Sequence, residues 1–231
     1  MDAEPVTQAF AEGINMILDR GISLIQWGDQ VHLHWGYPAT LAVYDFAIED
    51  SRLEEAVDIL KTANIGFIPV APYLDTTVYG VLRKKGFFFI HRLDQKSFPT
   101  RLHLIPGSLV HLSIHHADLL PSPFGPAQGL YLPKLPDFCV SLIRCIEDYA
   151  ADSPDTFLAE RSLHVMLAAA IYKEPGVDGK IYVVEQDTES EEDFRARQKT
   201  ALQEIEAWEL AEDDEPYRPK MIQFLLSGSI P

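Results

Sequence analysis

Residues 40–50 read TLAVYDFAIED, and this stretch decides the fold that we predict. Its apolar residues include β-branched and aromatic side chains, which favours a buried strand over a helix. Residues 22–27 form a similar apolar run between two glycines, so we expect another strand there. Between them, residues 29–35 form a short helix that Asp29 can cap. The order is therefore strand, short helix, strand.

The residues on either side extend this α/β pattern. Ser51 and Glu54 have the spacing of a capping box, which predicts a helix over 51–62. The residues expected on its buried face are Leu53, Ala56, Val57 and Leu60. Further elements are expected at 5–20 (helix), 67–70 (strand), 74–85 (helix ended by Gly86) and 86–92 (strand).

Residues 100–105 and 109–115 are predicted to form a hairpin around Pro106-Gly107. If the apolar residues face the core, the alternation places Arg101, His103, His111, Ser113 and His115 together on the other sheet face. Imidazoles gathered on one face could bind zinc or transfer protons, so the three histidines are candidate catalytic acids or bases. The alternative is an ordinary half-solvated sheet face.

The second half of the chain is predicted to be mainly helical. Residues 121–136 hold five prolines and two glycines, so we expect an extended linker there. The elements expected after it are a helix around 138–146, a helix over 154–172, a short strand at 181–184 and a helix over 194–210. We therefore expect a mixed α/β fold: a small sheet flanked by helices over residues 1–125, followed by a linker and helical region over 126–231.

Composition excludes several function classes. The chain has 35 acidic and 19 basic side chains, a net charge of −16, which disfavours nucleic acid as a partner because phosphate backbones need Lys and Arg. No apolar run approaches the roughly 18 residues of a membrane span. Cys139 and Cys145 lie six apart on one predicted helix and cannot bridge each other. Unpaired thiols favour a reducing compartment, so we expect a cytoplasmic location.

The order of elements resembles the nucleotidyltransferase superfamily. In that superfamily a strand ends in a Gly-Gly or Gly-Ser turn, a short helix follows, and the next strand carries two carboxylates that share magnesium. A closer resemblance is to a large group of fungal proteins with this fold. The stretches that carry it are Trp27-Gly28-Asp29, Tyr37-Pro38, residues 44–50 (YDFAIED) and residues 130–136 (LYLPKLP). The resemblance implies a scaffold and, in active members, in-line attack on a nucleotide α-phosphate.

The chain departs from the active pattern at two positions. The turn is Gly28-Asp29, which puts an acidic side chain where a triphosphate would approach, and the first carboxylate of the pair is replaced by Val43. Only Asp45 remains, and one carboxylate holds magnesium weakly. The resemblance thus implies the scaffold and argues against the transferase reaction. Trp27, Gly28, Asp29 and Asp45 become candidate ligand-binding residues, and Asp45 also a candidate catalytic one.

Three functions stay open, and the sequence does not decide whether the chain is an enzyme. The first is a degenerate nucleotidyltransferase-like protein that binds a small molecule or a protein. The second is an enzyme that uses this scaffold and the histidine face for other chemistry, as in fungal small-molecule metabolism. The third is a true nucleotidyltransferase with displaced carboxylates, the only case in which we expect magnesium. We expect no resident metal or other cofactor, and His32 and His34 are expected to splay apart on their helix.

Overall fold

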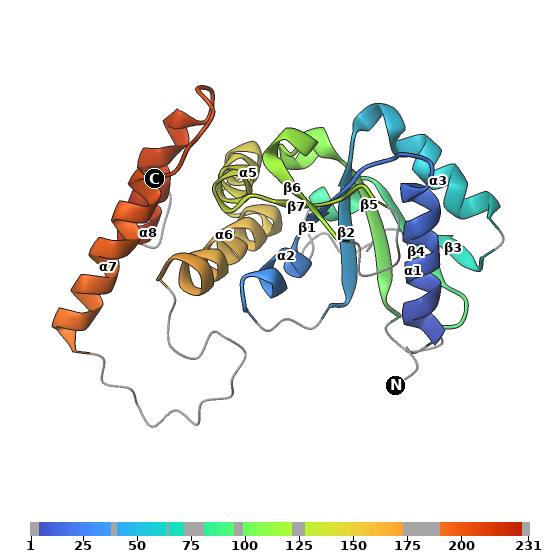
Figure 1. The fold of residues 1–231 in the computed structure, drawn as a ribbon, viewed down its shortest axis with the longest axis horizontal. Coiled ribbons are helices and arrows are strands. Elements are labelled where there is room, and N and C mark those ends of the chain that lie inside the picture. The colour runs from blue at the N-terminus through green and yellow to red at the C-terminus, as the bar shows by residue number, and fades with distance from the viewer. Residues whose placement is uncertain are drawn as a thin grey trace.

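The computed structural model describes residues 5–37, 41–63, 65–71, 81–94, 99–121, 128–172 and 190–227. These residues form a seven-stranded mixed sheet with helices on both faces (Figure 1), which confirms the predicted mixed α/β class. In spatial order the strands are β3 (Phe67–Val70), β4 (Phe87–His91), β5 (Arg101–Pro106), β2 (Val43–Ile48), β1 (Leu24–Trp27), β7 (Leu130–Pro133) and β6 (Ala117–Leu120).

Strand pairing explains why the central strands are so apolar. β2 runs parallel to β5 and β1 runs parallel to β7, whereas the other neighbours are antiparallel. Successive residues of a strand point to opposite faces, so Phe46 and Ile48 join one buried cluster and Ala47 joins the other. Both faces of the sheet are therefore core, which suits strands with nearly continuous apolar sequence.

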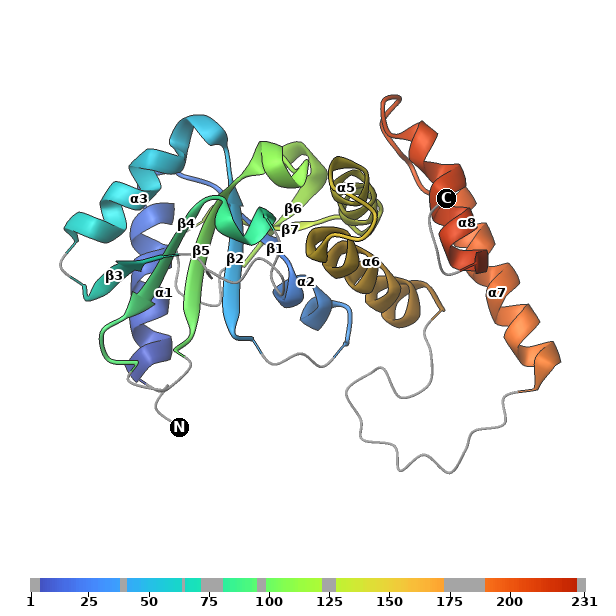
Figure 2. The same ribbon diagram turned by 180° about the vertical axis from the view of Figure 1, so that it is seen from behind.

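Two helices, α1 (Pro5–Leu18) and α3 (Leu53–Thr62), cover one face of the sheet (Figure 2). The buried residues of α3 are the four that its periodicity predicts: Leu53, Ala56, Val57 and Leu60. The predicted capping box is wrong, because a 3₁₀ turn, Asp50–Arg52, precedes α3 and the Ser51 hydroxyl donates to Glu49 instead. The spacing of its apolar residues, and not a capping box, is therefore the sequence feature that correctly predicts this helix.

The other face is covered by α5 (Leu135–Asp148) and α6 (Pro154–Met166). After Met166 the chain continues as a π-helical segment, Leu167–Tyr172. The short helix α2 (Asp29–His34) lies beside α6. Outside this layer, α7 (Glu191–Glu206) and α8 (Arg218–Ser227) pack together at one end of the molecule (Figure 1). Among the described residues, no helix is long and apolar enough to cross a membrane.

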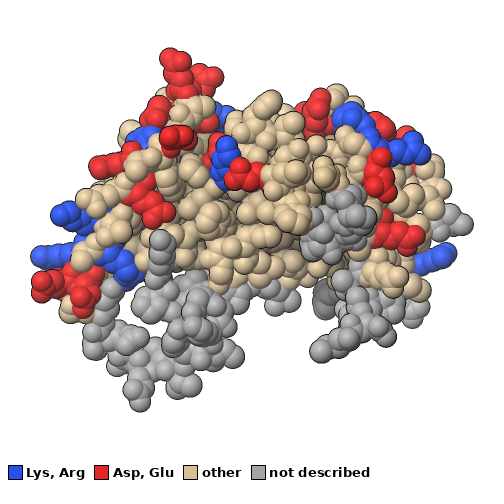
Figure 3. Space-filling model, viewed as in Figure 1, with Lys and Arg blue, Asp and Glu red and all other residues tan. Residues whose placement is uncertain are grey.

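Charged side chains are spread unevenly over the surface. Figure 3 shows acidic and basic side chains gathered over the C-terminal helices and around α3, with the middle of that face mostly uncharged. The first turn of α7 carries Glu191, Glu192 and Asp193, where acids favour the positive end of the helix dipole. On this face, acidic groups accompany the basic ones, so the view offers no continuous basic stripe of the kind that nucleic acids require.

The hairpin predicted over 100–115 is wrong in its second half. After β5 the chain makes a 3₁₀ turn, Gly107–Val110, then His111 in a left-handed conformation (φ 52°), and a second 3₁₀ turn, Ile114–His116. A hairpin partner has no room beside β5, because β2 and β4 already occupy both of its edges. The alternation of polar and apolar residues here therefore comes from turns and not from a strand.

The extended linker predicted over 121–136 is also wrong from residue 130 onward. β7 lies inside the sheet, between β1 and β6, and α5 begins at Leu135. Pro136 stands in the first turn of α5, where its missing N–H has no helical partner to lose. Most of the predicted helix over 74–85 and the whole strand at 181–184 fall outside the described residues.

Candidate functional site

A glycine turn links the end of β1 to the start of α2. Gly28 has φ 69° and ψ −150°, a conformation that glycine adopts at little cost, and it precedes the first helical residue, Asp29. Asp29 therefore lies in the first turn of α2 and does not cap it, contrary to the prediction. A Cβ at Gly28 would lie 2.7 Å from Oδ2 of Asp45, so the turn passes directly over that carboxylate.

Asp45 is bonded to His103 in the centre of the sheet. The two residues face each other across the parallel strands β2 and β5, and Oδ1 of Asp45 lies 2.7 Å from Nδ1 of His103. The side chains are 1% and 0% exposed. Nε2 of His103 lies 2.8 Å from the Lys85 carbonyl oxygen, and the ring stacks on Phe88 at 3.9 Å. Both ring nitrogens of His103 are therefore engaged inside the protein.

The pair joins two strands through their side chains. Oδ1 of Asp45 and the Lys85 carbonyl oxygen are the partners of the two nitrogens of His103, so neither nitrogen can turn to another ligand without losing a buried hydrogen bond. The contact between Asp45 and His103 thus ties β2 to β5. Gln30 adds a further tie by donating to the backbone carbonyl of Asp45. These contacts stabilise the pairing of β2 with β5, and they occupy Oδ1 of Asp45 with a hydrogen bond inside the protein.

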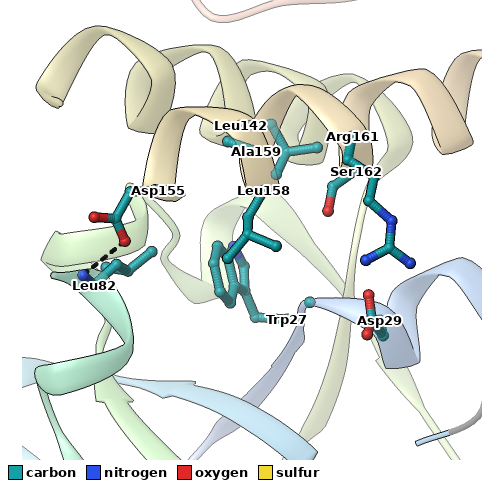
Figure 4. A pocket seen from close by; sticks show the side chains of 10 residues that line it. Trp27, Asp29, Leu82, Leu142, Asp155, Leu158, Ala159, Arg161 and Ser162 are labelled. Atoms are coloured by element: carbon teal, nitrogen blue, oxygen red, sulfur yellow. Dashed lines mark hydrogen bonds between the residues drawn. The ribbon is translucent and has the colours of Figure 1, made fainter. Parts of the chain in front are cut away.

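Beside this pair, a narrow cleft of about 50 Å³ lies between the Gly28 turn and α6 (Figure 4). Three of the four predicted ligand-binding residues line it: Trp27, Gly28 and Asp29; Asp45 does not belong to the described lining. The indole of Trp27 stands beneath Leu158, and Arg161 reaches down toward Asp29 (Figure 4). The cleft thus has an aromatic wall and a pair of opposite charges at one end.

Two polar groups of the cleft differ in how they are satisfied. The carboxylate of Asp155 accepts hydrogen bonds from the backbone N–H groups of Val81 (2.5 Å) and Leu82 (2.8 Å), so it fixes that segment. The indole Nε1–H of Trp27 is buried in a residue only 7% exposed and finds no acceptor among the described residues. A buried donor without an acceptor is costly, so this N–H marks a place for an incoming acceptor.

His32 and His34 point to separate surroundings, as the helical spacing predicts. His32 is buried, with Nδ1 at 3.6 Å from Oδ1 of Asp29. Burial lowers the pKa of His32; Asp29 opposes this shift and Arg161 adds to it. His34 lies 2.7 Å from the side-chain oxygen of Gln26, and burial lowers its pKa as well. The two imidazoles therefore have no shared ligand position.

The three histidines of the predicted hairpin do not share a face. His103 is sealed in the sheet, His111 lies 2.7 Å from Asp148 of α5, and His115 is exposed beside a second cavity near Asp50. The physical reason is the turn structure of residues 107–116, which sends successive side chains in unrelated directions. The prediction that these three histidines line one sheet face is therefore wrong.

Two further groups of reactive residues lie outside the lining of this cleft. Cys139 and Cys145 are both free and buried on α5, and burial raises each pKa to about 12, so neither thiol is a nucleophile at neutral pH. Among the described residues, ligand atoms of His116, Asp137 and Asp214 lie within 4.8 Å of one another and could hold a cation. Arg144 already donates to Asp214 at 2.6 Å and supplies positive charge there.

The α6 side of the cleft was not predicted. In sequence, Asp155 is an ordinary acid in the first turn of a helix, and Leu158 and Arg161 are one apolar and one charged residue of an amphipathic segment. Their contact with Trp27 depends on how α6 packs over the sheet, and no short-range sequence pattern indicates that packing.

In comparisons with known proteins, neither a family model nor a curated protein matches this chain.

Proposed function

We propose that this chain is a small-molecule-binding protein built on a nucleotidyltransferase-like scaffold that has lost nucleotidyl transfer. The observation that carries the proposal is the burial of Asp45 against His103. Magnesium sites need carboxylate oxygens that can reach the ion, and they usually combine one or two carboxylates with substrate phosphates. Here Val43 stands at the position of the first carboxylate, and the remaining carboxylate, that of Asp45, is already in contact with His103.

The arrangement of β1, α2 and β2 supports the scaffold part of the proposal. A strand ends at a glycine turn, a short helix follows, and the next strand runs antiparallel to the first and carries Asp45 near the turn. This is the order on which the resemblance rests. In an active member the glycine turn and the carboxylate of the second strand would bind the nucleotide. Here the Gly28 turn packs directly against the Asp45 carboxylate.

The cleft beside Trp27 is the proposed ligand site. Its unpaired indole N–H calls for a hydrogen-bond acceptor, and Leu158 offers an apolar surface above the ring. Arg161 and Asp29 at one end favour a ligand with a polar tip. Because the cleft measures about 50 Å³, we expect it to hold a group of a few atoms, such as one end of a larger ligand, that presents a carbonyl or carboxylate oxygen to Trp27.

The two competing functions have less support. An enzyme that uses a histidine face would need His103, His111 and His115 near one another, and they lie in three separate environments. A transferase with displaced carboxylates would need a second free acid near Asp45. The buried acid of the cleft, Asp155, is held by two backbone N–H groups and serves the fold.

The indole N–H signals in a nuclear magnetic resonance spectrum test this proposal. A library of small amides, carboxylates and ketones is screened, and the variant Trp27→Phe identifies the Trp27 signal. We expect binders to shift this signal and to leave that of Trp208 in place. Ser162→Phe, which fills the cleft, should abolish the shifts. The proposal is wrong if no compound moves the Trp27 signal, or if Ser162→Phe binds the same compounds equally well.

A further inference from the structure

A second and much larger cavity, of about 560 Å³, lies at the opposite end of the central strands from Gly28. It opens where β2 and β5 end and β1 begins, on an edge formed by the carboxyl ends of two parallel strands. Its volume falls in the range of small-molecule sites, about 300–1,000 Å³. Six of the residues that line it carry its chemistry: Ile25, Glu49, Asp50, Ser108, Leu112 and Ile114.

The polar wall of this cavity presents hydrogen-bond acceptors. Asp50 accepts hydrogen bonds from the backbone N–H (3.1 Å) and the hydroxyl (2.5 Å) of Ser108, and Glu49 accepts from the hydroxyl of Ser51 at 2.5 Å. The hydroxyl hydrogens of Ser51 and Ser108 are thereby used within the protein. The carboxylate oxygens of Glu49 and Asp50 and the oxygens of these two hydroxyls can accept further hydrogen bonds from a ligand, and Ser23, Ser113 and His115 also line the cavity.

The remaining walls are apolar, and no lysine or arginine is present among the described lining residues. Ile25 and Leu112 are buried and form an apolar surface, and Ile114 at the rim is 44% exposed. Two carboxylates beside an apolar surface fit a ligand that joins a positive charge to an apolar body. The net charge of −16 adds a long-range attraction for cations.

We propose that this cavity, here called the acidic cavity, binds an organic amine in its protonated form. The ammonium group would donate its three hydrogens to Asp50, to Glu49 and to a serine oxygen. The apolar part of the amine would cover Ile25, Leu112 and Ile114. The acidic cavity is separate from the Trp27 cleft, so this proposal does not depend on the proposed loss of nucleotidyl transfer or on the ligand of that cleft.

Calorimetric titration with three matched compounds tests this ligand class. The probe is 2-phenylethylamine, and its controls are 2-phenylethanol, which lacks the charge, and 3-phenylpropanoic acid, which carries the opposite one. We expect saturable binding of the amine, with the alcohol weaker by about tenfold or more and the acid not bound, because the ammonium group adds charge-assisted hydrogen bonds. Added salt should weaken amine binding, because the carboxylates are exposed.

Two variants place the binding in the acidic cavity. Glu49→Gln and Asp50→Asn should each weaken amine binding by about tenfold. Glu54→Gln removes the same charge from the exposed side of α3 and should leave binding unchanged. If Asp50→Asn loosens the Ser108 turn and lowers the melting temperature, Glu49→Gln decides alone, because within the described part of the chain its carboxylate bonds the neighbouring Ser51 and no residue of that turn.

Three results would overturn the proposal. Equal affinity for amine and alcohol would indicate a site for neutral hydroxylated ligands. Unchanged affinity in Glu49→Gln would place amine binding elsewhere on an acidic surface. Absence of saturable heat for the amine up to about 10 mM would mean that the cavity does not recognise this class. None of these results affects the test based on the Trp27 indole signal, so either proposal can be wrong while the other is right.

Discussion

Two histidine–aspartate pairs in this protein have the same length and different surroundings. Asp45 and His103 lie 2.7 Å apart in the centre of the sheet and are 1% and 0% exposed. Asp148 and His111 also lie 2.7 Å apart, but they are 49% and 23% exposed. In the first pair, removal of one partner leaves a buried polar atom without a hydrogen bond, whereas in the second pair water replaces the lost partner. Burial, and not distance, therefore decides what each pair contributes.

This difference bears directly on function. A surface pair can exchange its partner for a substrate or a proton, because water already competes for its atoms. A sealed pair cannot reach a ligand unless the sheet opens. Asp45 and His103 are the residue types that a catalytic or metal site uses, yet their position makes them part of the core.

The largest effect is expected from breaking the buried pair. Asp45→Ala should lower the free energy of unfolding by about 3–5 kcal/mol, because it removes one partner of a buried pair of ionisable groups and leaves the other unpaired. Asp148→Ala should lower it by less than about 1 kcal/mol. Urea unfolding of both variants and of the unchanged protein measures the contrast. Similar losses in the two variants would remove the distinction that we draw between the pairs.

A smaller effect is expected at the turn over Asp45. Gly28→Ala places a Cβ at 2.7 Å from Oδ2 of Asp45 and also strains the backbone, so it should cost about 2–4 kcal/mol. Gly21 has a similar φ of 68° with no atom within 4 Å of its added Cβ, so Gly21→Ala should cost only about 1–2 kcal/mol.

The double variant sharpens this comparison. When Asp45 is already alanine, the carboxylate that Gly28→Ala would strike is gone, and only the backbone strain remains. The cost of Gly28→Ala should then fall toward that of Gly21→Ala, a coupling of the kind that a double-mutant cycle measures. Additive losses in the double variant would show that the turn and the buried pair are independent.

Local patterns in the sequence were sufficient for most of the regular elements. The buried face of α3 follows from helical spacing, and β2 follows from its apolar run. β7 was missed because its flanking prolines resemble a linker, and a strand was predicted over 109–115 because turns can imitate the alternation of a strand. Periodicity reports which residues are apolar, and it does not report which edges of a strand are free.

The candidate site was only partly predictable for a related reason. Trp27, Gly28 and Asp29 are consecutive, so their gathering at one cleft follows from a single turn. Asp45 and His103 are separated by 58 positions and meet only because β2 and β5 pair in parallel. No short-range pattern contains that register, and so the sequence indicated both residues without indicating that they bind each other.

The smallest of the stability effects is expected from His32 and depends on pH. Burial lowers its pKa in the folded protein below the ordinary value of 6.5. As pH falls below 6.5 the unfolded chain takes up the proton first, so the free energy of unfolding decreases there and is unaffected above it. His32→Gln should flatten this decrease, and His115→Gln, at an exposed position, should not. An equal decrease in both variants would assign the pH dependence to other groups.

The central proposal, that Asp45 is held by His103 and binds no metal-bound nucleotide, is tested most directly by calorimetric titration of the protein with ATP and magnesium. We expect no saturable binding with a Kd below about 1 mM, and no difference when magnesium is left out. A Kd near the micromolar range that requires magnesium and is lost in Asp45→Asn would contradict it, because Asp45 would then have to leave His103 and reach the ion.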